Sequence, residues 1–321
     1  MPVSRMRRIG VVLAAATAAA ALAACTTTEQ TTTPEPTAKS FTIGFVNGGT
    51  TEFHNCLGKA IEAEVAAAGS KLIVLNSGQD SAKEKTNVES LIAQKVDALV
   101  VQSVNIEALK ATVVEAAEAK IPLFLTSVLP AGGDTSGFVA AALTDVEQVG
   151  RLDAEWIAQD AAGKPVKVGL IVGAPGAASD LMEKGFKAAL PANATVLETV
   201  QGMFNPGKAK TEAEKMIAAN PDLDYVFVAS EEMALAAQAA FASAGHPEVK
   251  VVANNGSPAG IQAIKDGKLA ATVANSPDET GVNIVKAVIK SLNGEQVDKI
   301  TKTQVILITK DNTDAAPKYC R

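Results

Sequence analysis

The sequence predicts an α/β protein in which helices cover both faces of parallel β-sheets, arranged as two similar lobes. From residue 41 onward, short β-branched runs alternate with longer Ala-, Glu- and Lys-rich amphipathic segments. This alternation is typical of parallel sheets. The candidate strands are almost wholly apolar, as strands buried on both faces are. A similar strand–helix–strand pattern begins at Val96 and again at Leu223, which indicates two related halves.

Nine segments are expected to be strands because each is a short apolar run bounded by polar or turn-forming residues. In chain order they are residues 41–46, 71–75, 98–101, 123–126, 166–172, 196–200, 225–229, 249–253 and 271–274.

Eight segments are expected to be amphipathic helices because apolar and charged residues recur in them at helical spacing. They are residues 53–68, 82–94, 106–119, 146–161, 181–190, 209–219, 232–244 and 279–292. The first lobe is expected to pass into the second near Thr144 and Asp145.

Residues 1–24 are interpreted as a secretory signal. Arg5, Arg7 and Arg8 precede an apolar run over residues 9–24, and Cys25 follows directly. This order is typical of a cleaved signal, and the cysteine resembles the one that bacterial lipoproteins carry at that place. The resemblance implies that Cys25 is lipidated and anchors an exported protein to the membrane. A spanning anchor is the alternative, although the run is Ala-rich and shorter than the roughly 20 residues a span needs.

The Thr-, Pro- and Glu-rich residues 25–40 are expected to form a disordered tether. Removal of residues 1–24, which hold three Arg and no acidic residue, takes the formal net charge from −6 to −9. That charge argues against a nucleic-acid partner, which needs a basic surface. Cys56 and Cys320 are the remaining cysteines, and export favours a disulfide between them over two unpaired thiols.

The sequence offers little support for an enzyme or for a bound cofactor or metal. The two histidines, His54 and His246, have no metal-ligand spacing, and HExxH, CxxC and GxSxG are absent. Residues 202–208 fit the GxxxxGK pattern of a phosphate loop, but Ala209 stands where Ser or Thr would bind magnesium. We therefore expect a non-enzyme without cofactor or metal.

Polar residues gather where the predicted strands end. Loops at the carboxyl ends of parallel strands line the ligand crevice of open α/β sheets. Amides, hydroxyls, a few carboxylates and two Phe rings suit a small polyhydroxyl ligand. The alternative is that they are ordinary polar loops that cap a sheet. The set comprises residues 47–54, 102–103, 126–127, 179–180, 203–204, 230–231, 254–255 and 275.

The chain resembles the ribose-binding group of the type I periplasmic solute-binding proteins over residues 41 to about 311. The strongest stretches are residues 78–84, 230–236, 255–260 and 266–278. The resemblance implies two Rossmann-like lobes joined by three hinge strands, closing on a sugar or sugar-like ligand that is delivered to an ABC permease. It implies a monomer with a first lobe of residues 41–144 plus 276–304 and a second of 145–275 plus 305–321.

The family's pocket positions carry over only in part. The resemblance places the first loop's paired aromatics at Phe53 and His54, near Thr51, and keeps an aromatic at Phe204. Elsewhere the residue type changes. An Asp–Arg pair becomes Ser127 and Val128, an Arg becomes Asp180, an Asn becomes Ser230, an Asp becomes Asn255 and a Gln becomes Asn275.

These changes favour a sugar alcohol, a cyclitol or another neutral sugar over ribose, because the charged hydrogen bonds that hold ribose are lost. Two alternatives stay open. Asp180 would suit a small cationic solute, and the same fold would serve a sensory receptor that presents its loaded form to a signalling partner. The genes beside this one, a permease or a sensor kinase, would distinguish transport from sensing.

Overall fold

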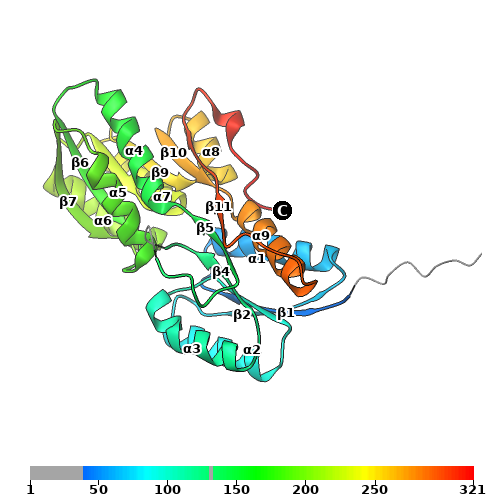
Figure 1. Cartoon of the computed structure of the whole chain (residues 1–321). Coiled ribbons are helices and arrows are strands. Elements are labelled where there is room, and N and C mark those ends of the chain that lie inside the picture. Colours follow the sequence, from blue (N-terminus) through cyan, green and yellow to red (C-terminus); the bar gives the residue numbers. More distant parts are fainter. Residues whose placement is uncertain (1–38, 130–132) are drawn as a thin grey trace, which may run out of the picture. The chain divides into compact units, whose positions relative to one another are not determined.

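The structure is a computed structural model that describes residues 39–129 and 133–321. The predicted signal, Cys25 and all but the last two residues of the predicted tether lie outside the described residues. Two six-stranded sheets with flanking helices make up the fold of the described chain (Figure 1). The predicted fold class is confirmed.

The first sheet has the strand order β11-β5-β4-β3-β1-β2, with every pair of neighbours parallel. Helices α2 and α3 cover one face and α1 and α9 the other, each with its own apolar core (Figure 1). The strands are β1 (Thr42–Asn47), β2 (Lys71–Asn76), β3 (Ala98–Val101), β4 (Leu123–Ser127), β5 (Ala140–Thr144) and β11 (Ile300–Thr303), and the helices are α1 (Glu52–Ala67), α2 (Ser81–Ala93), α3 (Ile106–Glu118) and α9 (Pro277–Leu292).

The second sheet has the order β12-β10-β9-β8-β6-β7, and only β12 runs antiparallel to its neighbour among the described strands. Its core is one continuous apolar cluster. The strands are β6 (Val166–Val172), β7 (Ala194–Gln201), β8 (Tyr225–Val228), β9 (Lys250–Asn255), β10 (Ala271–Asn275) and β12 (Val305–Ile308), and the helices are α4 (Val146–Ala161), α5 (Ala177–Ala189), α6 (Pro206–Ala219), α7 (Glu231–Ser243) and α8 (Pro258–Lys265).

The chain passes between the sheets at three places. It leaves the first sheet after Thr144, returns to it through α9 after Asn275, and leaves it again at Gln304. Gln304 alone separates β11 from β12, so two short strands in direct succession belong to different sheets. The division of the chain between two lobes at these places stays a prediction.

The sequence prediction missed three strands and one α-helix. Strand β5 has the sequence AAALT, and Ala is a poor strand former. Strands β11 and β12 have four residues each, and helix α8 has eight. Segments this short carry too few periodic positions to stand out. Pairing with strands distant in the sequence stabilises β5, β11 and β12.

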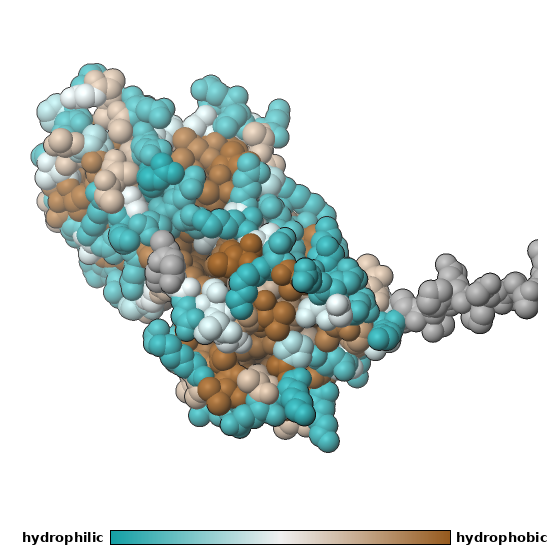
Figure 2. Space-filling model, viewed as in Figure 1, coloured by the Kyte–Doolittle hydropathy of each residue, from teal (hydrophilic) through white to brown (hydrophobic). Residues whose placement is uncertain are grey.

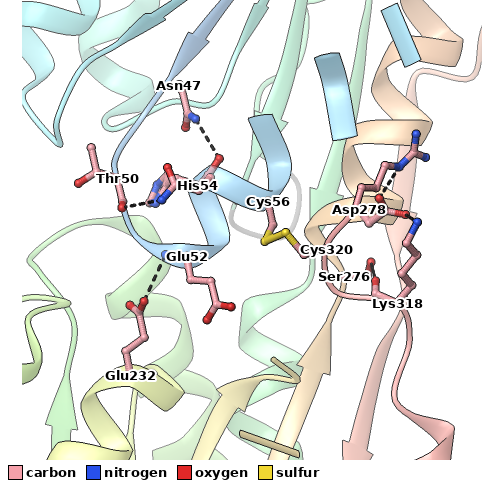
Figure 3. Close-up of a disulfide and its surroundings, with 12 residues drawn as sticks. Asn47, Thr50, Glu52, His54, Cys56, Glu232, Ser276, Asp278, Lys318 and Cys320 are labelled. Carbon is pink, nitrogen blue, oxygen red and sulfur yellow. Dashed lines mark hydrogen bonds and ion pairs between the residues drawn. A yellow bond between two sulfur atoms is a disulfide. The ribbon is translucent and has the colours of Figure 1, made fainter. Parts of the chain in front are cut away.

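Two further features bear on the site. Cys56 in α1 and Cys320 in the C-terminal tail form a disulfide with an S–S distance of 2.06 Å (Figure 3). On the face seen in Figure 2, hydrophilic residues cover much of the surface and apolar patches lie between them. Met203, beside the predicted site residue Phe204, is one of the large apolar side chains exposed on the described chain.

Candidate ligand-binding site

The loop between β1 and α1 is held by hydrogen bonds from three neighbouring strands. The Asn47 Nδ2 atom donates to the backbone oxygen of His54 at 2.9 Å (Figure 3). The Gly48 amide donates to Gln102 Oε1 at 2.9 Å, and Asn76 Nδ2 donates to the Gly49 oxygen at 2.5 Å. These bonds give the loop a defined shape, which is what a site needs to present Thr51 and Phe53.

His54 is tied into this loop by its ring. Its Nδ1 atom lies 2.7 Å from the Thr51 hydroxyl, and the ring packs so closely on Gly49 that a Cβ atom there would stand 2.8 Å from Cε1. Burial lowers the pKa of His54 to about 4, and a hydrogen bond with the Gln102 side chain opposes that shift only in part. The imidazole is therefore neutral near pH 7. Phe53 lies edge-on to this ring, with the centroids 6.1 Å apart.

Two buried polar atoms at the end of the first sheet lack a partner within the described chain. They are Asn47 Oδ1 and Thr126 Oγ1. Val46 pairs with Val101 and Val101 with Leu125, so Asn47, Gln102 and Thr126 follow in register on neighbouring strands. Buried polar atoms normally have partners, so these two oxygens suit a ligand or a bound water.

Sequence reasoning placed Asn47 and Thr126 in polar loops but did not select them, because nothing local shows that their oxygens are unused. The predicted residue Ser127 ends β4, and its side chain lies outside the description.

Phe204 follows the end of β7 in an unusual backbone conformation. Met203 and Phe204 have φ angles of +60° and +49°, which non-glycine residues rarely adopt. The Phe204 ring lies against Gly173, just after β6, where a Cβ atom would stand 2.1 Å from Cζ. Backbone strain of this kind concentrates at functional sites, so the loop supports a role for Phe204.

Asp180 lies in the first turn of α5 and is exposed. The helix begins after Gly176, which offers no side-chain cap. A carboxylate in the first turn of a helix is stabilised by the helix dipole. Asp180 can therefore stabilise the start of α5 whether or not it contacts a ligand.

Ser230, Asn255 and Asn275 end or follow three neighbouring strands of the second sheet. Ser230 caps α7, because its Oγ atom accepts a hydrogen bond from the Met233 amide at 3.4 Å. Asn255 ends β9 with a φ angle of +138°. Asn275 ends β10 and is buried, with 5% of its surface exposed. The structure therefore brings these three residues to one edge of the sheet and gives Ser230 a capping role.

Glu231 secures the turn that follows Asn255. Its carboxylate accepts hydrogen bonds from the amides of Gly256 and Ser257, at 2.9 and 2.8 Å, and from the Thr272 hydroxyl at 2.6 Å. Burial raises the pKa of Glu231, and these hydrogen bonds oppose the shift. The sequence prediction took Glu231 as a polar loop residue and did not foresee this bracing role.

Asp153 of α4 is a second buried acid in this half of the chain. Both of its carboxylate oxygens lack partners among the described residues. Burial, and then the charge of Glu231, raise the pKa of Asp153 well above its ordinary value. The buried site therefore favours the protonated form of Asp153.

The strand-end loops of the two sheets contact one another at the first turns of α1 and α7. The Glu52 amide donates to Glu232 Oε1 at 3.3 Å (Figure 3). Burial and then the neighbouring charge of Glu232 raise the pKa of Glu52.

Residues 39–129 and 133–321 contain no cluster of His, Cys, Asp and Glu that could hold a metal. They also contain no helix long and apolar enough to cross a membrane.

Comparison with known proteins gives consistent matches. A model of the periplasmic binding protein domain matches residues 43–296. The ribose import binding protein of Salmonella typhimurium is 32% identical over 251 residues, which are 78% of this chain and 83% of that protein.

Two solved structures match as whole folds. The binding protein of the arabinose ABC transporter of Shewanella sp. ANA-3, bound to L-arabinofuranose, has a TM-score of 0.80 at 27% identity and covers 85% of this chain and 93% of its own. An ABC transporter solute-binding protein of Mycobacterium smegmatis with bound glycerol has a TM-score of 0.81 at 26% identity. The match covers 88% of this chain and 100% of that protein.

Proposed function

The chain belongs to the periplasmic binding protein domain family, and from that membership we propose that it is the extracytoplasmic solute receptor of an ABC importer. It captures a small sugar or sugar-like polyol and delivers it to a membrane permease. The observation that carries the proposal is the gathering of hydroxyls, amides and a Phe ring at the strand ends of two sheets whose loops contact each other. The relatives' names, a ribose importer and an arabinose transporter, support the same class of ligand.

A neutral ligand fits the charge of the proposed site. His54 is neutral near pH 7 because its pKa is about 4, and Ser127 and Val128 are uncharged. Hydroxyl and amide groups pair with sugar hydroxyls, while a flat ring covers the C–H face of a sugar. Phe53 and Phe204 would supply that apolar cover, and Thr51, Ser230, Asn255 and Asn275 the polar contacts. Asp180 would accept from a hydroxyl.

We further propose that capture is coupled to closure of the two lobes about the three crossings. A ligand that contacts both lobes only in the closed form shifts the population toward that form by its differential affinity. The protein acts as a monomeric binder without catalysis or cofactor. Lipid attached to Cys25 holds it at the outer face of the cell membrane, and residues 25–40 act as the tether.

A thermal-shift screen of the purified protein, freed of carried-over ligand, tests the proposal. The panel holds D-ribose, L-arabinose, D-galactose, glycerol, myo-inositol and the small cations choline and putrescine. A ligand at about 100 times its dissociation constant adds roughly 2.7 kcal/mol of stability, which raises Tm by a few degrees. A shift with a sugar or polyol supports the proposal. A shift with a cation alone favours a cationic solute held by Asp180, and no shift with any probe contradicts both readings.

A further inference from the structure

The C-terminal tail after β12 returns from the second sheet to the helices of the first. Three attachments hold it there. The Ser276 hydroxyl donates to the Lys318 oxygen at 2.5 Å, and Cys320 forms the disulfide with Cys56 (Figure 3). Arg321 pairs with Asp278 of α9 at 2.6 Å and with Glu64 of α1 at 2.7 Å. The last four residues are therefore fastened to both α1 and α9.

The disulfide joins α1 close to the proposed ligand site. Helix α1 begins at Glu52, so Cys56 lies within one turn of Phe53 and His54. The Ncap residue Thr51 makes no side-chain capping bond, and its hydroxyl instead contacts His54. A side-chain cap normally stabilises the start of a helix. In place of a cap from Thr51, the Glu52 amide donates to Glu232 of α7, and the tail adds a covalent attachment at Cys56.

Tyr319 directly precedes Cys320 in the tail. Its side chain is buried, with 4% of the residue exposed, and its hydroxyl has no hydrogen-bond partner within the described chain. Burial, and then the charges of Glu231, Glu52 and Glu232, raise the pKa of Tyr319.

We infer that Cys320 and Arg321 are positioning residues of the ligand site. The Cys56–Cys320 bond fixes α1 near its start, and the Arg321 ion pairs join Glu64 of α1 to Asp278 of α9. These attachments keep the first turn of α1 set against the first turn of α7, where the Glu52 amide donates to Glu232. The tail thereby orders Thr51, Phe53 and His54 before a ligand arrives, which lowers the entropic cost of binding. The effect on affinity rests on the proposed function, whereas the ordering of the two first turns does not.

The test compares three proteins. Cys56→Ser combined with Cys320→Ser removes the bond and leaves the Arg321 ion pairs. Lys318→Ala is the matched control, because the Lys318 side chain is exposed and its ion pair with Asp278 is long, at 3.9 Å. The Ser276 hydroxyl bonds the backbone oxygen of Lys318, which the variant retains. Circular dichroism verifies that each protein is folded at the temperature used. Reduction of the folded wild-type protein with dithiothreitol is a second route, in which two electrons and two protons pass from the dithiol to Sγ of Cys56 and Cys320.

Two measurements on these proteins test the inference. Hydrogen–deuterium exchange of the ligand-free proteins is expected to show about tenfold faster exchange over residues 47–57 and 229–236 in the double variant, and no change in Lys318→Ala. Calorimetry is expected to show a roughly tenfold rise in the dissociation constant of the wild-type protein's tightest probe from the sugar and polyol panel, within the range of long-range coupling.

Faster exchange confined to the tail, or a lower Tm with the dissociation constant unchanged, would overturn the inference. If the wild-type protein binds no probe, the proposed function fails on its own, and the exchange measurement still decides the ordering of the two first turns.

Discussion

The ring of Phe204 occupies the space that a side chain at position 173 would need. A Cβ atom built on Gly173 would lie 2.1 Å from Cζ and 2.4 Å from Cε2 of the ring. The two residues follow β7 and β6, which are neighbours in the second sheet. The place of the aromatic ring at the strand ends therefore depends on the absence of a side chain at Gly173.

Gly173→Ala is expected to displace the Phe204 ring and to weaken sugar binding. Overpacking of this kind costs typically 1–3 kcal/mol. Phe204→Ala, which removes the ring itself, is expected to raise the dissociation constant on the order of tenfold. Calorimetry measures both changes. Gly58→Ala is the matched control, because its Cβ would lie 3.5 Å from the nearest atom, Asn47 Nδ2. Wild-type affinity in Gly173→Ala would contradict a role for the ring.

His54 is expected to make the folded protein less stable as the pH falls. Its pKa is about 4 in the folded protein against 6.5 for the free group. Below pH 6.5 His54 becomes protonated in the unfolded chain but stays neutral in the folded protein. The free energy of unfolding therefore falls between about pH 6.5 and pH 4. At about pH 5 the loss from this group is roughly 2 kcal/mol. His54→Gln should lose less stability than wild type between about pH 7.5 and pH 5 in urea unfolding, and equal losses would refute the prediction.

Asp153→Asn is expected to stabilise the protein at neutral pH. Burial raises the pKa of Asp153 in the folded protein well above 3.8. As the pH rises above 3.8, Asp153 ionises in the unfolded chain before it does so in the folded protein, and the free energy of unfolding falls. The amide has nearly the same volume and no charge, and replacement of an unpaired buried acid gains on the order of 1–3 kcal/mol. Urea unfolding at about pH 7.5 measures the gain. Asp180→Asn, at an exposed position, should stay within about 0.5 kcal/mol. A less stable Asp153→Asn protein would contradict the prediction.

Glu231→Ala is expected to destabilise the protein by about 3 kcal/mol, because it leaves two backbone amides and the Thr272 hydroxyl buried without an acceptor. Glu231→Gln retains one accepting oxygen and should recover part of the loss. If the turn after Asn255 presents that residue to the ligand, affinity should follow the same order, with wild type above Gln and Gln above Ala. An unchanged dissociation constant in folded Glu231→Ala would show that this turn does not position Asn255 for ligand binding.

Asp180 distinguishes the two classes of ligand. For a neutral polyol, Asp180→Ala should raise the dissociation constant on the order of tenfold, through the loss of one charge-assisted hydrogen bond. For a cationic solute, Asp180→Asn, which keeps the shape and removes the charge, should nearly abolish binding. Titration calorimetry with the probes that bind wild type measures both. Unchanged affinity for every probe would remove Asp180 from the site.

The confirmed part of the sequence prediction is the fold class and its main elements. The expected strands at residues 98–101 and 225–229 match β3 (Ala98–Val101) and β8 (Tyr225–Val228) closely. Both are continuous apolar runs between polar residues, so a few neighbouring residues suffice to identify them. The polar strand ends were predictable for the same reason, since they follow directly from where the strands stop.

The hydrogen-bond partner of each polar group in the site could be identified only from the tertiary structure. Ser230 and Asn47 looked alike as polar loop residues, yet the Ser230 hydroxyl caps α7 while the Asn47 oxygen has no partner in the described chain. His54 meets Gln102 and Phe204 meets Gly173 only because strands distant in the sequence pair in register. The apolar pattern that selects strands and helices is local, and sequence alone determined it. Hydrogen-bond partners, burial and pKa values depend on atoms brought near by folding, and only the tertiary structure decided them.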